Sequence, residues 1–321
     1  MSWRKMMLAG GAVLGAAAAY NRVATRRVRA GENDGGENEW FDWLGRAIAY
    51  TRRGSGAPIL LVHAIHAAAS SHEWQSNVDA LADVGTVYTI DLLGFGRSER
   101  PAVRYSAASY LHLLDDFART VIGEPCVLVA NSLSGAFAAA LGAQDPERYP
   151  ALVLVEPAGI SSLSEPGDMG GEAARVVGDT RVVGTALFNL SVSHSRLRRW
   201  LERAYAARAR ITDGLVRQYY ATSHQPGARF APAAFASRQL NIDVREAVRQ
   251  LSQPTLLVWG ARARLAPPGE ARAFLALNRH LELAILDDAG DLPHAEQPAK
   301  FNHLLADFIS RASVEVPAGL A

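Results

Sequence analysis

The sequence predicts an α/β fold, in which a mostly parallel sheet carries helices on both faces and a helical cap is inserted midway along the chain. Three observations support this prediction. Short apolar runs of strand length alternate with helical patterns. One run, Cys126–Ala130, turns sharply into a small-residue helix at Ser132. From residue 161 to residue 241 the alternation stops, and helical patterns rich in Ala, Arg and Leu replace it.

Composition indicates a globular chain with a large core. Of the 321 residues, 49% are hydrophobic and 20% are charged, which excludes a disordered polymer. The formal net charge is +1, and no basic stripe is interleaved with aromatic residues, so we expect no nucleic-acid partner. The single cysteine, Cys126, excludes an internal disulfide. His66 and His72 have no companion acid cluster, so neither a metal nor a cofactor is predicted.

Residues 1–29 form an apolar and basic segment. The apolar run Met6–Tyr20 lies between Arg4-Lys5 and an arginine cluster. Its length of about 15 residues suits a signal-peptide core and falls short of the roughly 20 that span a bilayer. Cations directly after the run disfavour cleavage, so we predict a membrane anchor on an undetermined side. A surface-lying helix, a secreted protein cleaved near Ala16–Ala19, and a helix docked on the protein or a partner stay open.

The remaining chain divides by composition into a linker (30–39), a core (40–160 and 242–312), a cap (161–241) and a tail (313–321). The expected strands, of which the first is antiparallel, are Trp40–Thr51, Ile59–His63, Thr86–Asp91, Cys126–Ala130, Ala151–Glu156, Thr255–Gly260 and Leu281–Leu286. The expected helices include Tyr105–Val121, Gly135–Leu141, Ser195–Arg210, Pro268–Leu277 and Ala299–Ile309.

Ser132 stands where the strand Cys126–Ala130 turns into the following helix. Such a turn strains its central residue and points that side chain outward, and only small neighbours tolerate the close backbone approach. Ala130 and Ser134 hold the positions where glycines usually stand, and Gly135 follows. The pattern is typical of a nucleophile elbow, although an ordinary strand-to-helix turn with an incidental serine also fits it.

Five blocks in order carry a resemblance to a known family: Leu61–Ala64, Asp91–Ser98, Asn131–Gly135, Pro254–Gly260 and Gly290–Phe301. With these blocks the chain resembles the α/β-hydrolase superfamily over about residues 40–310, and is most similar to its capped esterase, epoxide-hydrolase and C–C-hydrolase group. The resemblance implies that Ser132 attacks an acyl carbon while the N–H groups of Leu133 and Ile65 hold the oxyanion. It also implies a histidine base on the last loop and a carboxylate that orients it.

Two departures from the family pattern fall on this machinery. Alanine, Ala263, stands where relatives carry the orienting acid, and Asp291 stands where they carry the histidine. His294 lies three residues further on, and residues three apart share a helix face, so the expected triad is Ser132, His294 and Glu156. Asp291 is the second-choice base, because a carboxylate of ordinary pKa removes a hydroxyl proton poorly. Glu156 as a buried structural acid and His294 as a surface residue remain alternatives.

Two functions therefore follow from the sequence. The first is a membrane-associated serine hydrolase acting on an apolar or amphipathic ester-like substrate. The second is a binding or interaction subunit of a membrane complex, in which catalysis has lapsed at Ala263 and Asp291 and a protein partner replaces the substrate. An aspartate-nucleophile enzyme such as a dehalogenase is disfavoured, because position 132 is serine.

Overall fold

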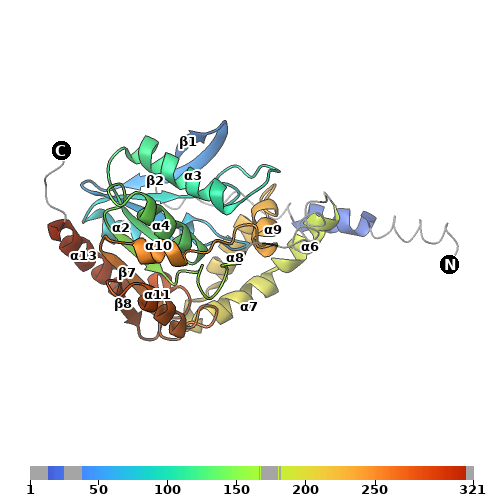
Figure 1. The fold of residues 1–321 in the computed structure, drawn as a ribbon. Coiled ribbons are helices and arrows are strands. Elements are labelled where there is room, and N and C mark those ends of the chain that lie inside the picture. Colours follow the sequence, from blue (N-terminus) through green and yellow to red (C-terminus); the bar gives the residue numbers. More distant parts are fainter. Residues whose placement is uncertain (1–13, 25–37, 166, 168–179, 181, 316–321) are drawn as a thin grey trace.

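The computed structural model describes residues 14–24, 38–165, 167, 180 and 182–315. Most of the predicted linker and tail, and parts of the predicted N-terminal segment and cap, lie outside these residues; residue 39 of the predicted linker begins β1, and residues 313–315 of the predicted tail end α13. One eight-stranded sheet organises the molecule, with the strand order β1-β2-β4-β3-β5-β6-β7-β8 (Figure 1). The strand pairs β1–β2 and β2–β4 are antiparallel, and every later pair in this order, from β4–β3 to β7–β8, is parallel.

The strands coincide with the apolar runs of the sequence. They are β1 (Glu39–Trp43), β2 (Arg46–Arg53), β3 (Pro58–Val62), β4 (Thr86–Ile90), β5 (Val127–Asn131), β6 (Leu152–Val155), β7 (Thr255–Gly260) and β8 (Glu282–Leu286). The single strand expected over Trp40–Thr51 is wrong, because the chain forms a hairpin there. Leu44 and Gly45 turn the chain with φ of 54° and 75°, as a two-residue hairpin turn requires.

Helices cover both faces of the sheet. They are η1 (Ser71–Trp74), α2 (Val78–Ala82), α3 (Ala107–Phe117), η2 (Ala118–Ile122), α4 (Leu133–Gln144), α10 (Arg245–Gln250), η4 (Pro268–Glu270), α11 (Ala271–Leu277), α12 (Pro293–Glu296) and α13 (Pro298–Glu315). Alternate residues of β3 enter different apolar clusters: Leu60 packs in one with α3 and α4, and Leu61 packs in the other with α13. This alternation is what a strand buried on both faces gives.

Between β6 and α10 the chain leaves the sheet and forms a helical layer. Its helices are α6 (Val183–Ser191), α7 (His194–Ala204), η3 (Arg208–Arg210), α8 (Asp213–Ser223) and α9 (Phe230–Ala236). Leu197, Leu201 and Val216 build an apolar cluster of its own, to which Leu292 of the last loop also belongs. The layer therefore packs over the carboxyl ends of the strands, where open α/β sheets bind ligands.

Residues 14–24 are helical and lie against this layer beside α6 (Figure 1). Ala24 is buried, and the side chain of Asn21 bonds with both Val182 and Asn189. Within the described residues, none of the helices combines the length and apolar character needed to cross a membrane.

Candidate active site

Ser132 has the strained conformation that the elbow prediction requires. It links β5 to α4 with φ 56° and ψ −123°, a region that non-glycine residues rarely occupy. Small residues surround it because space is short: a Cβ on Gly135 would lie 3.1 Å from the Cβ of Pro157. The Ser134 hydroxyl donates to the carbonyl of His63 at 2.7 Å, which ties the elbow to the loop after β3.

The half-buried Ser132 opens into a cavity of about 290 Å³ between the sheet and the cap. Most of the lining is apolar. The walls are Ala64, Ile65, His66, Asn131, Ser132, Glu156, Ala158, Ser162, Leu163, Trp200, Ala204, Phe235, Leu265, Ala266, Asp291 and Leu292. An apolar chamber with a few convergent polar groups is the usual form of a small-molecule site.

Two backbone N–H groups beside Ser132 are free to hold an oxyanion. Among the described residues, neither Leu133 nor Ile65 donates its backbone N–H to any acceptor, although both residues are buried. Ile65 lines the cavity, and Leu133 begins α4, where the first N–H groups of a helix have no partner within the helix. Buried N–H groups are rarely left unpaired unless they serve a ligand or water.

Asp291 lines the same cavity as Ser132, and its carboxylate is held by the loop after β7. Its Oδ1 accepts hydrogen bonds from the backbone nitrogens of Leu265 at 2.7 Å, Ala266 at 3.0 Å and Arg264 at 3.1 Å. Its Oδ2 accepts only from Arg264, at 3.2 Å. Burial raises the pKa of Asp291, although the backbone donors oppose that rise. Asp291 is therefore a carboxylate held by three backbone donors, and its Oδ2 retains free lone pairs among the described contacts.

Glu156 also lines the cavity, at the end of β6. Its Oε1 accepts from the backbone nitrogen of Gly260 at 2.9 Å, and its φ is 45°. Burial raises the pKa of Glu156 well above its ordinary value, and the nearby Asp291 carboxylate raises it further. Burial and the neighbouring carboxylate thus both favour the protonated form of Glu156.

His294, the expected base, lies outside this cavity, so the structure does not bring it to Ser132. Its ring is fully buried and stacks on Trp74 with a centroid distance of 4.1 Å. Both ring nitrogens are buried without a hydrogen-bond partner in the described structure, so Glu156 does not orient the ring either. The reason lies in the helix boundary. The short helix α12 begins at Pro293, so Asp291 stands outside it, and the three-residue spacing does not place the two side chains on one face.

Glu73 instead is the acid nearest His294, at 3.8 Å between Oε1 and Nε2. Burial raises the pKa of Glu73 to about 8, and burial lowers the pKa of His294 to about 3. Both groups are therefore neutral at pH 7 and form no ion pair. The Glu73 carboxyl accepts from the backbone nitrogen of Ala64 at 2.9 Å and from Asn131 at 3.3 Å, so it supports the loop that carries Ile65.

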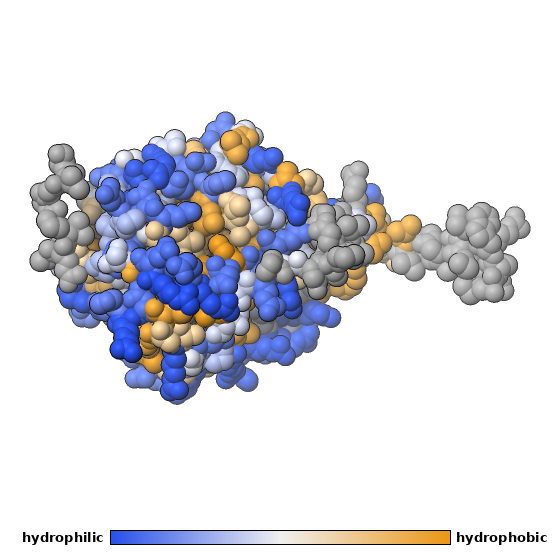
Figure 2. All heavy atoms as spheres, viewed as in Figure 1, coloured by the Kyte–Doolittle hydropathy of each residue, from blue (hydrophilic) through white to orange (hydrophobic). Residues whose placement is uncertain are grey.

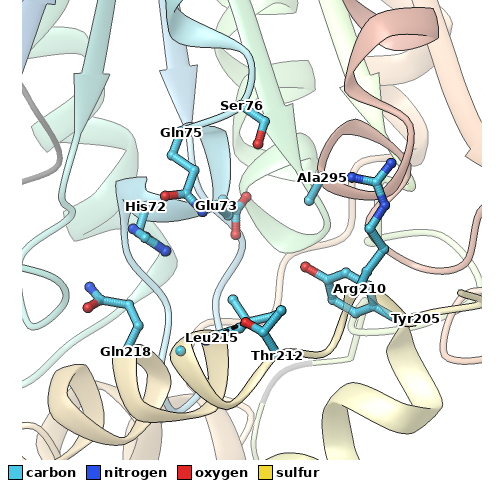
Figure 3. Close-up of a pocket in the computed structure, with 11 residues that line it drawn as sticks. His72, Glu73, Gln75, Ser76, Tyr205, Arg210, Thr212, Leu215, Gln218 and Ala295 are labelled. Carbon is cyan, nitrogen blue, oxygen red and sulfur yellow. Dashed lines mark hydrogen bonds between the residues drawn. The ribbon is translucent and has the colours of Figure 1, made fainter. Parts of the chain in front are cut away.

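Glu73 separates the cavity from a second, more polar pocket of about 600 Å³ (Figure 3). Figure 3 shows its carboxyl group between η1 and the cap, facing the side chains of Tyr205 and Thr212. The pocket is lined by His72, Glu73, Gln75, Ser76, Tyr205, Arg210, Thr212, Gly214, Leu215, Gln218 and Ala295. Because Asn131 lines the first cavity and bonds to Glu73, the two pockets share a wall.

Two further histidines lie near the site. His63 positions loops: its Nε2 accepts from the backbone nitrogen of Leu92 at 3.0 Å, and its Nδ1 lies 2.6 Å from the carbonyl of Ala64. His66 lines the cavity and packs on Trp200, and burial lowers its pKa to about 3. Within the described ranges, no three or more His, Cys, Asp or Glu side chains gather in a way that could hold a metal ion.

Sequence reasoning missed the apolar walls and Glu73. Trp200 and Phe235 come from cap helices, and nothing in a helical pattern tells which aromatic residue faces a cavity rather than the cap's own core. Glu73 stands next to Trp74 in a short polar run, where an acid usually marks an exposed turn.

Comparison with known proteins agrees with the fold. A sequence profile of the Alpha/beta hydrolase family matches residues 59–304. The chain is 27% identical over 268 residues to a 2-hydroxymuconate semialdehyde hydrolase of Pseudomonas sp. strain CF600, a match that covers 81% of this chain and 89% of that one. A serine hydrolase involved in carbazole degradation superposes with a TM-score of 0.72 at 22% identity, over 86% of this chain and 99% of that structure.

A membrane phospholipase A, described as a bacterial virulence factor, superposes with a TM-score of 0.71 at 20% identity, over 96% of each chain. The predicted fold class and the predicted superfamily are thus confirmed. Because the family profile spans most of the chain, this protein belongs to the Alpha/beta hydrolase family.

Proposed function

We propose that the protein is a serine hydrolase that acts on a small, mostly apolar carbonyl compound of ester type. The observation that carries this proposal is the state of Ser132. It occupies a strained backbone conformation at the wall of a cavity, beside two backbone N–H groups without acceptors. Strain of this kind costs about 1–3 kcal/mol and persists where the surroundings enforce it for function.

The cavity sets the class of substrate. Its volume of about 290 Å³ is at the lower end of the range for small-molecule sites. Ile65, Trp200 and Phe235 favour an apolar acyl or alkyl group, and the Glu156 carboxyl adds a polar group to the wall. The similar sequence of a 2-hydroxymuconate semialdehyde hydrolase supports a small carbonyl substrate.

The chemistry is acyl transfer in two steps. The Ser132 oxygen attacks the carbonyl carbon, its proton passes to a base, and the negative oxygen that forms is stabilised by the N–H groups of Leu133 and Ile65. The carbon–oxygen bond to the leaving group then breaks, and the leaving group takes the proton. Water repeats the sequence on the acyl-serine and releases the carboxylic acid.

Asp291 is the base in this proposal, in place of His294. It lines the cavity with Ser132, its Oδ2 has unused lone pairs, and burial raises its pKa, which makes it a stronger base than an ordinary carboxylate. A carboxylate remains a weaker base than imidazole at pH 7. We therefore expect slow turnover, with the oxyanion hole and substrate binding supplying about 10³–10⁴-fold acceleration over water.

A fluorophosphonate probe, which reacts with activated serines, tests the proposal. We expect the wild-type protein to be labelled, Ser132→Ala to lose the label, and Ser252→Ala, an exposed serine far from the cavity, to keep it. Hydrolysis of short p-nitrophenyl esters should follow the same pattern. A folded wild-type protein with neither labelling nor turnover contradicts the proposal.

A second candidate is a binding protein in which catalysis has lapsed. It is favoured by the Asp291 carboxylate, which already accepts from three backbone N–H groups, and by the sealed ring of His294. In this case the fluorophosphonate probe does not label the protein, but a small apolar ester still raises its melting temperature. Phe235→Asp in the cavity wall then removes that increase. If the protein is also recovered from a mild membrane extract together with a stoichiometric protein partner, the predicted role as a subunit of a membrane complex is supported.

We also propose that residues 1–29 bring the protein to a membrane. An apolar run of about 15 residues is flanked there by six basic residues, and no acid is present. Basic residues beside an apolar segment strengthen its binding to anionic lipid.

A further inference from the structure

Residues 14–24 form one unit with the cap. The Asn21 side chain donates to the carbonyl of Val182 at 3.1 Å and accepts from the Asn189 amide at 2.9 Å. The Tyr220 hydroxyl donates to the carbonyl of Ala24 at 3.4 Å. These contacts join the segment to α6 and α8, so the surfaces of residues 14–24 and α6 adjoin (Figure 1).

The outer face of α6 is apolar and exposed. Val183, Leu187 and Leu190 are 37%, 54% and 49% exposed, and their spacing of four and three residues puts them on one side of the helix. Residues 182–192 contain no charged side chain. A surface helix normally turns polar residues to water, so this face is built to contact something apolar.

Residues 14–24, beside α6, carry further exposed apolar residues. Leu14 and Val23 are 49% and 51% exposed. Ten large hydrophobic residues are exposed in the described structure, and five of them lie on these two helices. The other five, Trp40, Leu44, Val84, Leu265 and Ile285, are spread over the β1–β2 hairpin, the loop before β4, the loop after β7 and β8. Figure 2 shows hydrophobic atoms at the narrow end of the molecule, where residues 14–24 lie.

The charge that this part of the sequence carries selects the partner of the α6 face. Residues 1–29 carry six basic residues and no acid, and Arg22 is exposed on the described helical segment. A second copy of the chain would bring the same positive charge, so like charges would face each other, whereas anionic lipid headgroups complement them.

We propose that Val183, Leu187 and Leu190 form a lipid face through which the cap lies on an anionic bilayer. This inference rests on the proposed membrane association and goes beyond it, because it assigns part of the contact to the cap. The cap helix α7 follows α6 after two residues and contributes Trp200 and Ala204 to the cavity wall. Docking on the lipid face therefore holds the cavity wall next to the layer in which an apolar substrate dissolves.

Flotation of the full-length protein with phosphatidylcholine vesicles, with and without phosphatidylglycerol, tests the lipid face. We expect the wild-type protein to float with the anionic vesicles, and Leu187→Glu/Leu190→Glu to lower the bound-to-free ratio about tenfold or more. The matched control is Leu44→Glu/Ile285→Glu, two exposed apolar residues on other parts of the surface, which should float like the wild type. Equal melting temperatures and equal fluorophosphonate labelling of all variants show that the fold and cavity are intact.

The outcomes separate this inference from the proposals on which it rests. If the wild-type protein does not float, membrane association and the lipid face both fail. If the wild type and Leu187→Glu/Leu190→Glu float equally, only the lipid face fails. A dimer that the α6 substitutions dissociate, with no vesicle binding, assigns the surface to a second copy and also overturns the lipid face. If the wild-type protein floats but is not labelled by the fluorophosphonate, only the hydrolase proposal is contradicted.

Discussion

The Oδ1 atom of Asp291 lies 2.7 Å from the backbone nitrogen of Leu265, and this hydrogen bond joins the loop after β8 to the loop after β7. In the family pattern these loops supply the histidine and the acid of the triad. Here the Asp291 carboxylate links the two loops by accepting hydrogen bonds from the backbone. No histidine stands at position 291, so the side chain of Ala263 has no histidine to orient.

Asp291→Asn separates the two roles of this carboxylate. The amide oxygen still accepts from the backbone donors, while the side chain no longer accepts a proton. We expect the melting temperature to change little and ester turnover to fall by about 10²-fold or more. Asp291→Ala leaves buried N–H groups unpaired and should lower the free energy of unfolding by about 1–3 kcal/mol. Equal turnover in the wild type and Asp291→Asn would remove Asp291 from the mechanism.

The pH dependence of turnover reports on the same group. Asp291 must be deprotonated to act as a base, and burial raises its pKa. Turnover should therefore rise with pH, with a midpoint above the ordinary carboxyl value of about 4. Burial lowers the pKa of His294 to about 3, so His294 as the base would place the midpoint below the ordinary carboxyl value, and a pH profile of kcat/KM for a p-nitrophenyl ester distinguishes the two bases.

The elbow strain can be measured directly. Glycine adopts φ near +56° without a Cβ penalty, whereas alanine keeps that penalty. Ser132→Gly should therefore be more stable than Ser132→Ala by about 1 kcal/mol or more, even though glycine usually destabilises a folded chain. Urea unfolding of the two variants, both of them inactive, gives the comparison; a less stable glycine variant would mean that the strain is small.

Glu73 should make the protein less stable as pH rises. Burial raises its pKa from 4.5 to about 8, so between these values the folded state binds more protons than the unfolded state. The free energy of unfolding then falls as pH rises through this window, by a few kcal/mol on the order of the pKa shift. Glu73→Gln keeps the shape without a titrating group, so its stability should be flatter above about pH 5 in urea titrations. Parallel curves for the two proteins would contradict a neutral buried Glu73.

His294 should matter for stability and not for labelling. His294→Leu keeps an apolar filling beside Trp74 and removes the ring. We expect fluorophosphonate labelling to stay within about threefold of the wild type. Because burial lowers the pKa of His294 to about 3, the wild type loses stability as pH falls from 6.5, and the variant should lose less. A folded variant that cannot be labelled would restore His294 as the base.

Much of the fold could be predicted from local sequence, because buried strands consist of continuous apolar residues and sharp turns need small ones. The run from Cys126 to Ala130 and the small residues around Ser132 are of this kind. The sequence does not predict the β1–β2 hairpin because Leu44 takes a positive φ that leucine seldom adopts, so the pair Leu44-Gly45 differs from the Asn-Gly or Asp-Gly pair that usually marks such a turn. Helix ends were also imprecise: α7 ends at Ala204, before the expected Arg210.

The candidate site divides in the same way. The positions of Ser132, Glu156 and Asp291 follow from strand ends, which apolar runs define, and all three line one cavity. The direction of His294 depends on where a four-residue helix begins, and a sequence pattern does not fix that boundary within two residues. The clamp on Asp291 consists of backbone N–H groups, which every sequence contains and no side-chain pattern reveals.

The clamp also bears on how this chain can evolve. A histidine at position 291 would leave three backbone donors without their acceptor, while an acid at position 263 alone would bring a second buried carboxyl near Asp291. Each exchange made alone is therefore expected to destabilise the fold.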